Sequence, residues 1–329
     1  MTELKGKALF NLLKINAMDD PRFGETSWRV EELRAVEIST LFERLKKKGI
    51  VLDEKSFALY AEEGDSPEDL IACLWDDEED LEGHDQVYLI LFELWRRLLP
   101  KKQTLSVFCD ELDWLIDLYD RGELEDEEQL QNVLSLLEDI LDDASDQEGS
   151  PQEVFIEVSR YCAHDLESFI YDFITDQIEA EDETYASELL DDFYDYITDK
   201  KWFDFLRARI FSFAEGDEAE VLIERLLEQL KEEPCQELLM EIIANLVHHG
   251  HTALFRRAVK QALPQIKTEK ELAELLTFVA DFYRCLDREE KEQQIVKLIQ
   301  ERVNKPAHLH PKDDILHRFT DLLENGMID

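Results

Sequence analysis

Glycine is scarce in this sequence, and its spacing excludes several kinds of active site. The chain has only 10 glycines in 329 residues, and neighbouring glycines are always at least 15 residues apart. A loop that cradles a phosphate needs clustered glycines, because the backbone must approach the anion without a clash from Cβ atoms. Rossmann and P-loop nucleotide sites are therefore excluded, and so is the Gly-x-Ser-x-Gly elbow of serine hydrolases.

Cysteines and long apolar runs are also sparse. The five cysteines lie at least 36 residues apart, so the chain has no Cys-x-x-Cys pair of the kind used for zinc binding or disulfide exchange. We expect buried, reduced thiols in a cytoplasmic protein. The longest run without Asp, Glu, Lys or Arg is Ile242–Phe255, which is too short to cross a bilayer. No membrane partner is expected.

Basic residues are scarce in the middle of the chain. The sequence has 36 Lys+Arg against 79 Asp+Glu, a formal net charge of −43. Residues 1–60 have a net charge of +1, residues 61–200 of −37 and residues 201–329 of −7. We expect a near-neutral N-terminal helical segment, a strongly acidic helical region and a C-terminal helical-hairpin region with these boundaries. Such acidity argues against direct binding to nucleic acid or to an anionic membrane, because both would repel it.

The spacing of apolar residues predicts helices along nearly the whole chain. Apolar side chains recur at intervals of three and four, whereas alternating strand patterns are scarce. Helix-start signals such as Ser150-Pro151 and Thr268 with Glu271 are followed by stop signals such as Gly49 and Gly122, which suit a left-handed cap. The expected helices span residues 4–15, 28–48, 54–63, 67–76, 84–99, 104–121, 126–144, 151–163, 165–180, 183–199, 201–214, 217–231, 234–249, 251–263, 268–286, 288–303 and 312–325.

The short connections between these helices predict an all-α fold of antiparallel hairpins. Connections of two to six residues place successive helices side by side. Such an array, without strands to organise it, is most economically an α-solenoid with packing like that of HEAT or tetratricopeptide repeats. The sequence signatures of tetratricopeptide and ankyrin repeats are absent, however, and an irregular helical bundle is the alternative.

Two aspartate-rich segments resemble the DDxxD motif of isoprenoid synthases, all-α enzymes in which this motif holds Mg²⁺ against a diphosphate. The segments are Asp191–Asp195 and Asp76–Asp80. On a helical wheel the three aspartates of the first segment lie opposite the apolar stripe, so they face solvent rather than a cavity. Arg160 is the only basic residue between positions 122 and 199, which leaves little to bind a diphosphate. We expect no catalytic residue, no cofactor and no metal here.

Histidine-containing pairs give a similar result. His84-Asp85 and His164-Asp165 resemble the His-Asp pair of all-α metal-dependent phosphohydrolases. That site needs a further histidine upstream, and no histidine precedes His84. Six of the eight histidines follow residue 247, close to expected helix ends, where an imidazolium is stabilised without any metal. No metal site is expected from these residues.

Aromatic residues gather where the acidic region ends. Residues 155–213 contain 14 of the 32 aromatic side chains, interleaved with carboxylates. Most lie on the apolar stripes of their helices, but Tyr171, Tyr196, Phe205 and Phe211 lie off them. These four could anchor a partner, because aromatics dominate binding hot spots and an acidic rim selects basic ligands. The alternative is that solenoid helices bury two flanks, which widens the core stripe.

These features predict a non-enzymatic helical-repeat scaffold or adaptor that binds another protein, with an acidic surface for basic or amphipathic partners. One alternative is an acidic chaperone, or a decoy that mimics the backbone of a nucleic acid. Such binding should weaken steeply with salt, as polyelectrolyte binding does. A second alternative is a Mg²⁺-dependent all-α enzyme that uses the aspartate-rich segments.

Overall fold

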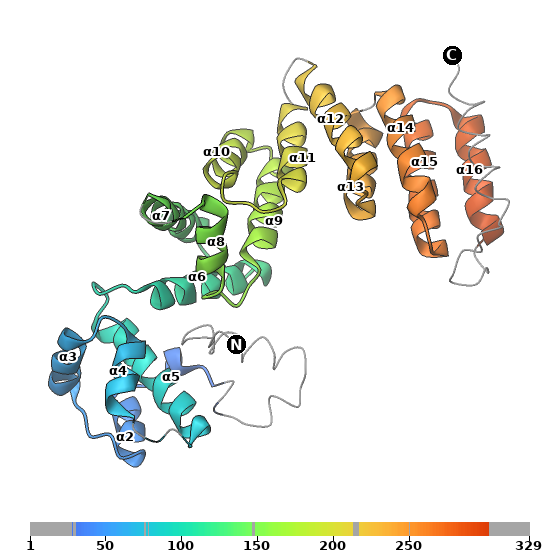
Figure 1. The fold of residues 1–329 in the computed structure, drawn as a ribbon. Coiled ribbons are helices and arrows are strands. Elements are labelled where there is room, and N and C mark those ends of the chain that lie inside the picture. Colours follow the sequence, from blue (N-terminus) through green and yellow to red (C-terminus); the bar gives the residue numbers. More distant parts are fainter. Residues whose placement is uncertain are drawn as a thin grey trace. The chain divides into compact units, whose positions relative to one another are not determined.

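The fold is all-α, as the sequence predicts. The computed structural model of the chain describes Trp28, residues 31–75, Asp77 and residues 79–146, 149–212, 217–249 and 251–302. Within these residues there are α-helices and short 3₁₀ turns but no strand (Figure 1). The helices are α2 (Ile38–Lys47), α3 (Glu54–Glu63), α4 (Pro67–Leu74), α5 (Leu81–Leu98), α6 (Leu105–Asp120), α7 (Glu127–Ser145), α8 (Pro151–Ser159), α9 (Leu166–Glu179), α10 (Glu183–Phe193), α11 (Lys200–Phe211), α12 (Glu218–Glu232), α13 (Gln236–His249), α14 (Thr252–Ala262), α15 (Glu269–Cys285) and α16 (Glu289–Arg302).

The chain forms two compact units. The first contains the described residues up to Ile170 together with Asp195–Thr198, and the second contains Tyr171–Tyr194 and the described residues from Asp199 onward. The boundary therefore lies inside α9. The segment Asp195–Thr198 belongs to the first unit although it follows α10, which belongs to the second.

The N-terminal part of the first unit is built around α5. All nine residues from Val87 to Trp95 are buried, which is why this stretch is apolar almost all round. Helices α2, α3 and α4 and the 3₁₀ turn η3 (Leu33–Ala35) pack against α5. Their apolar residues form one core, in which Leu41, Phe57 and Trp95 are fully buried. A polar network around Glu93 of α5, described below, lies beside this core.

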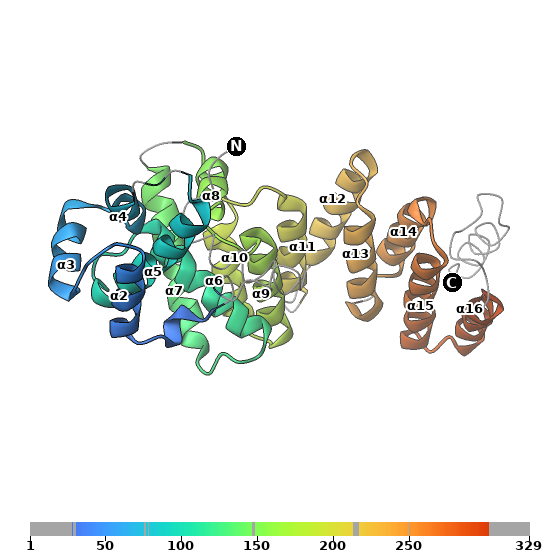
Figure 2. The same cartoon turned by 90° about the horizontal axis from the view of Figure 1, so that it is seen from below.

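In the second unit, α11 to α16 pack as stacked hairpins. Each pair α11–α12, α13–α14 and α15–α16 is in contact, and so are α11 with α13, α13 with α15 and α12 with α14. Figures 1 and 2 show α12 to α16 following one another in chain order. Contacts between alternate helices are the pattern expected when hairpins stack in layers. Between layers, the rings of Phe255 and Phe282 stack with centroids 3.8 Å apart.

Local capping signals place several helix ends where the sequence predicts them, but α8 ends at Ser159 and α10 at Phe193, before the predicted residues 163 and 199. The Thr268 side chain accepts a hydrogen bond from the Glu271 N–H at 3.2 Å, and Glu271 accepts one from the Thr268 N–H at 3.1 Å. A second capping box begins at Ser150. Gly49 and Gly122 have φ angles of 92° and 66°, as left-handed caps require. The helices expected over 4–15 and 312–325 lie outside the described residues.

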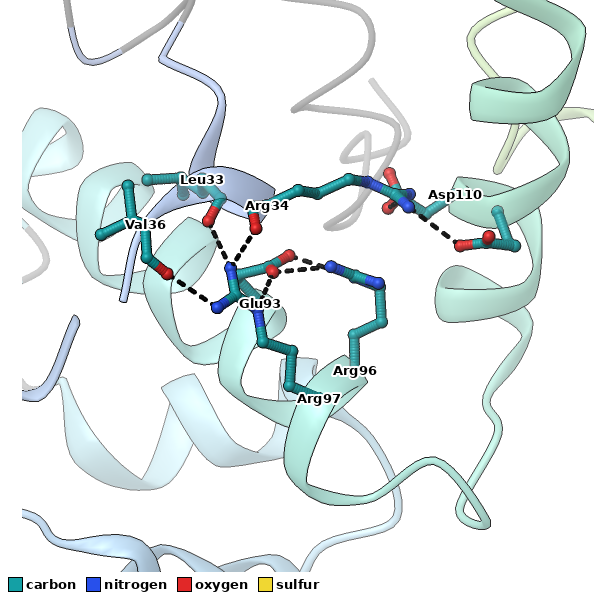
Figure 3. Close-up of polar contacts among 8 residues, drawn as sticks. Leu33, Arg34, Val36, Glu93, Arg96, Arg97 and Asp110 are labelled. Carbon is teal, nitrogen blue, oxygen red and sulfur yellow. Dashed lines mark hydrogen bonds and ion pairs between the residues drawn. The ribbon is translucent and has the colours of Figure 1, made fainter. Parts of the chain in front are cut away.

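The helix predicted over residues 28–48 is wrong in its first part. Within the described residues 31–37 the chain forms the turn η3, and α2 begins at Ile38. The guanidinium of Arg97 in α5 lies against this segment (Figure 3). It donates hydrogen bonds of 2.6–2.7 Å to the carbonyl oxygens of Leu33, Arg34 and Val36. The Leu33 carbonyl oxygen also accepts the 3₁₀ hydrogen bond of the turn from the Val36 N–H at 3.1 Å.

The five cysteine thiols are expected to be buried, and the structure confirms this only in part. Cys109 is buried, but Cys73 and Cys285 are exposed, so the expectation is wrong for these two. As for the membrane, none of the helices in the described ranges combines the length and the apolar character needed to cross a bilayer.

Candidate functional site

A pocket of about 440 Å³ lies in the second unit between α9, α11 and α13. Each helix contributes residues spaced three or four apart, which lie on a single helical face. The lining residues are Tyr171, Asp172, Thr175 and Glu179 from α9, Trp202, Phe205 and Arg209 from α11, and Glu241, Ala244, Asn245 and His248 from α13.

Aromatic rings form one wall of this pocket. Tyr171 and Trp202 meet edge to face, with centroids 5.3 Å apart and an interplanar angle of 85°. Tyr171 also meets Phe203 at 6.0 Å and 72°. Phe205 is a core side chain with 1% of its surface exposed. Edge-to-face pairs contribute about 0.5–1.5 kcal/mol beyond the burial of their area, so this wall is held in place before any ligand arrives.

The polar lining has a net negative charge. Asp172, Glu179 and Glu241 contribute carboxylates, while Arg209 is the one lining residue with a permanent positive charge. The Arg209 guanidinium lies 3.5 Å from a Glu179 oxygen. With His248 neutral, the lining carries a net charge of −2. Charges act more strongly in a partly enclosed pocket than in bulk water, so this excess favours a cation.

The Tyr171 hydroxyl stays neutral at physiological pH. Burial, and after it the negative charge of Glu241, raises the pKa of this phenol above its usual value near 10. A neutral phenol can donate a hydrogen bond and keeps the electron-rich ring face that attracts cations. Aromatic faces, a neutral hydroxyl and excess carboxylate together form an environment suited to a cationic group.

The four aromatic residues singled out from the sequence are not gathered at one place. Tyr171 and Phe205 line the pocket. Tyr196 lies in the first unit, where it is 5% exposed and donates a hydrogen bond to Asp142. Phe211, at the end of α11, is 37% exposed. Tyr196 and Phe205 are thus core side chains, and a partner-binding role for the four residues stays a prediction.

Sequence reasoning did not single out Trp202, Arg209 or Glu241. Trp202 lies on the apolar stripe of α11, and the two charged residues belong to a chain crowded with charges. The pocket brings together helices about 30 to 70 residues apart in the chain, so no local motif marks it. The one available signal is the stripe Tyr171, Thr175, Glu179, which mixes polar and aromatic residues on one face of α9.

The aspartate-rich segment of α10 lies at the surface. Asp191 and Asp195 are exposed, as the helical wheel predicts, and Asp191 pairs with Arg207 at 2.9 Å. Among the residues that the structure describes, no three potential ligands converge on a metal site. The other segment, Asp76–Asp80, falls partly outside those residues.

His164 takes part in a buried contact of the first unit. Asp113 of α6 is fully buried, and its carboxylate accepts hydrogen bonds from the N–H groups of Ala163 and His164 at 2.9–3.1 Å. The His164 Nδ1 lies 2.9 Å from the same carboxylate. Asp113 therefore fixes the loop before α9 to α6, which gives His164 a structural role.

A second polar network lies beside the core of α5 (Figure 3). Glu93 has 4% of its surface exposed and accepts hydrogen bonds from Arg96 and Arg97. Arg34 donates to Asp110 at 2.8 Å and lies 4.5 Å from the centre of the Trp114 ring. Buried charges are tolerated when they are paired and hydrogen-bonded in this way. The network secures η3 against α5 and α6.

Comparison with known proteins identifies no relative of this chain. No protein-family model matches the chain, and neither a curated protein nor a solved structure matches it.

Proposed function

We propose that this protein is a non-enzymatic helical scaffold that binds another protein through the α9–α11–α13 pocket. Its ligand would be a lysine or arginine side chain in a basic or amphipathic segment of the partner. The support is the combination, in one pocket, of the Tyr171–Trp202 corner with a net charge of −2. A cation over an aromatic face gains about 0.5–2 kcal/mol, and nearby carboxylates add to that attraction.

The size of the pocket suits a peptide better than a single small ion. About 440 Å³ lies within the range of about 300–1,000 Å³ that is typical of ligand sites. It can hold a long basic side chain together with neighbouring apolar groups that contact Trp202 and Tyr171. An amphipathic segment supplies both kinds of contact, which is why we favour it over a free cation.

We further propose that the protein acts in a reducing compartment such as the cytoplasm. Cys73 and Cys285 are exposed free thiols. Exposed thiols of this kind persist where glutathione and thioredoxin keep cysteines reduced.

The first prediction concerns the carboxylates of the pocket. Asp172→Asn with Glu241→Gln should weaken binding of a fluorescent amphipathic peptide with a central lysine by about tenfold, because two attractive charges are removed without loss of volume. The measurement is fluorescence anisotropy at near-physiological salt. Both residues are exposed, so the fold should be unaffected.

The matched control is Asp176→Asn with Glu237→Gln. These residues lie on the same two helices, are also exposed, and do not line the pocket. Equal weakening by the two double variants would reject the pocket as the binding site. Loss of all binding between roughly 50 and 200 mM salt would instead support the acidic decoy.

A further inference from the structure

We propose that the first unit has a second binding site, of opposite charge, that takes an acidic peptide segment bearing one large apolar side chain. The site is a separate pocket of about 180 Å³ formed by η3, α2 and α5. It does not depend on the function proposed above. Its lining residues are Trp28, Glu31, Leu33, Arg44, Lys47, Lys48, Gln86, Leu89 and Ile90.

The floor of this pocket is apolar and firmly held. Leu33, Leu89 and Ile90 belong to the core of the first unit, and Trp28 packs against that core. The Leu33 carbonyl is hydrogen-bonded by Arg97, so the network in Figure 3 also fixes this wall. A preformed apolar floor binds a ligand without first having to become ordered.

The volume limits the apolar part of the ligand to one side chain. An apolar cavity of about 150 Å³ inside a protein binds benzene, so a pocket of about 180 Å³ has room for one aromatic ring or one branched aliphatic group. A flat membrane surface or a row of nucleic-acid bases would not use a pocket of this shape.

The rim is positively charged within a very acidic protein. Glu31 pairs with Arg44 through two hydrogen bonds of 2.7 Å, and this partner lowers the pKa of the Glu31 carboxyl group. Lys47 and Lys48 are exposed at the end of α2, and neither forms an ion pair with another described residue. The lining thus carries a net charge of +2. Two ammonium groups beside an apolar floor are complementary to carboxylates beside an apolar side chain.

The acidity of the whole chain favours a short ligand. The Debye length at physiological salt is about 8 Å, so a compact acidic segment placed at Lys47 and Lys48 experiences mainly these two charges. Glu82 also lies beside the pocket, where it accepts hydrogen bonds from Trp28 and Gln86, so the ligand's carboxylates are expected at the lysine end of the rim. A long polyanion would extend beyond the rim and meet the carboxylates of a protein with a net charge of −43. An acidic peptide is therefore favoured over nucleic acid.

The test uses a fluorescent peptide with one phenylalanine flanked by glutamates, and anisotropy at near-physiological salt. We expect Lys47→Gln with Lys48→Gln to weaken its binding about tenfold. We also expect the peptide with serine in place of phenylalanine to bind about tenfold more weakly to the unmodified protein. Lysines near a helix end also stabilise the helix, so thermal unfolding of each variant is measured in parallel.

The control is Lys46→Gln with Lys55→Gln, which removes the same charge from exposed positions outside the pocket. It should change the affinity less than twofold. The proposal is overturned if this control weakens binding as much as the pocket variant, if serine replaces phenylalanine without loss, or if the peptide does not bind. Tighter binding of single-stranded DNA or of anionic vesicles would overturn the assignment to an acidic peptide.

Discussion

Replacing Asp113 with alanine is expected to destabilise the first unit by about 3 kcal/mol. The carboxylate is fully buried and accepts hydrogen bonds from two backbone N–H groups and faces the His164 ring. Its removal leaves these donors without their acceptor, and each buried unsatisfied donor costs about 1–3 kcal/mol. For a unit of this size, the loss corresponds to a fall in melting temperature of roughly 10 °C.

The measurement is unfolding in urea followed by tryptophan fluorescence, to which Trp95 and Trp114 of the first unit contribute. Asp113→Asn keeps one acceptor oxygen and should lose about half as much stability, which provides a second result if the alanine variant fails to fold. The control is Glu157→Ala, since Glu157 is exposed and pairs with the exposed Arg160. A loss for Asp113→Ala no larger than that of the control would show that the buried carboxylate contributes little.

Replacing Glu93 with alanine is expected to cost a similar amount, about 3 kcal/mol. Glu93 is the shared acceptor of Arg96 and Arg97, whose side chains are only 22% and 19% exposed. Without it, two guanidinium groups lie close together in a poorly solvated region. Breaking a buried ion pair by removing one partner typically costs about 3–5 kcal/mol. Equilibrium unfolding in urea measures the loss.

The complementary variant is Glu93→Met with Arg96→Leu, which removes one charge of each sign and replaces both with apolar volume. It should recover most of the stability lost by Glu93→Ala, because apolar replacements of buried pairs are often neutral. Arg97 is kept in this variant because it also binds the carbonyls of residues 33–36. If Glu93→Ala alone leaves stability unchanged, the network has no structural importance.

The features that the sequence predicts well are those determined by neighbours in the chain. The capping box of Thr268 and Glu271 and the left-handed caps at Gly49 and Gly122 are formed as expected. Each needs only a few consecutive residues, and a helix of more than two turns shows its apolar period directly. This is why most helix positions from residue 54 to residue 302 agree with the structure to within three residues, whereas the helices expected over 151–163 and 183–199 end earlier, at Ser159 and Phe193.

The features that the sequence does not predict depend on contacts between distant residues. Arg97 donates a hydrogen bond to the Val36 carbonyl, more than 60 positions earlier, and Asp113 accepts one from Ala163, 50 positions later. Weak sequence signals do accompany the buried acidic residues of these two networks. Glu93 is the single charge in the buried run 87–95, and Asp113 adjoins the buried Leu112. An acidic residue within a buried stripe indicates a partner but does not identify it.

The candidate pocket shows the same limit. A helical wheel compares the apolar character of the faces of a single helix, whereas this pocket depends on which faces of α9, α11 and α13 meet. Helices with neighbours on two flanks bury a wider stripe, which is why Phe205 is in the core and also lines the pocket. Tyr171 could be predicted as a candidate from the sequence because it is aromatic and lies off the apolar stripe of α9.

The return of Asp195–Thr198 to the first unit has a consequence for protein synthesis. In this segment Ile197 is fully buried and Tyr196 is bonded to Asp142, so the first unit is incomplete without it. A ribosome that has translated as far as Ile170 has not yet made these four residues. At about 5–20 residues per second, they emerge roughly 1 to 6 s later. During that interval the nascent first unit exposes apolar surface that the finished protein covers, and α10 is translated before that surface is closed.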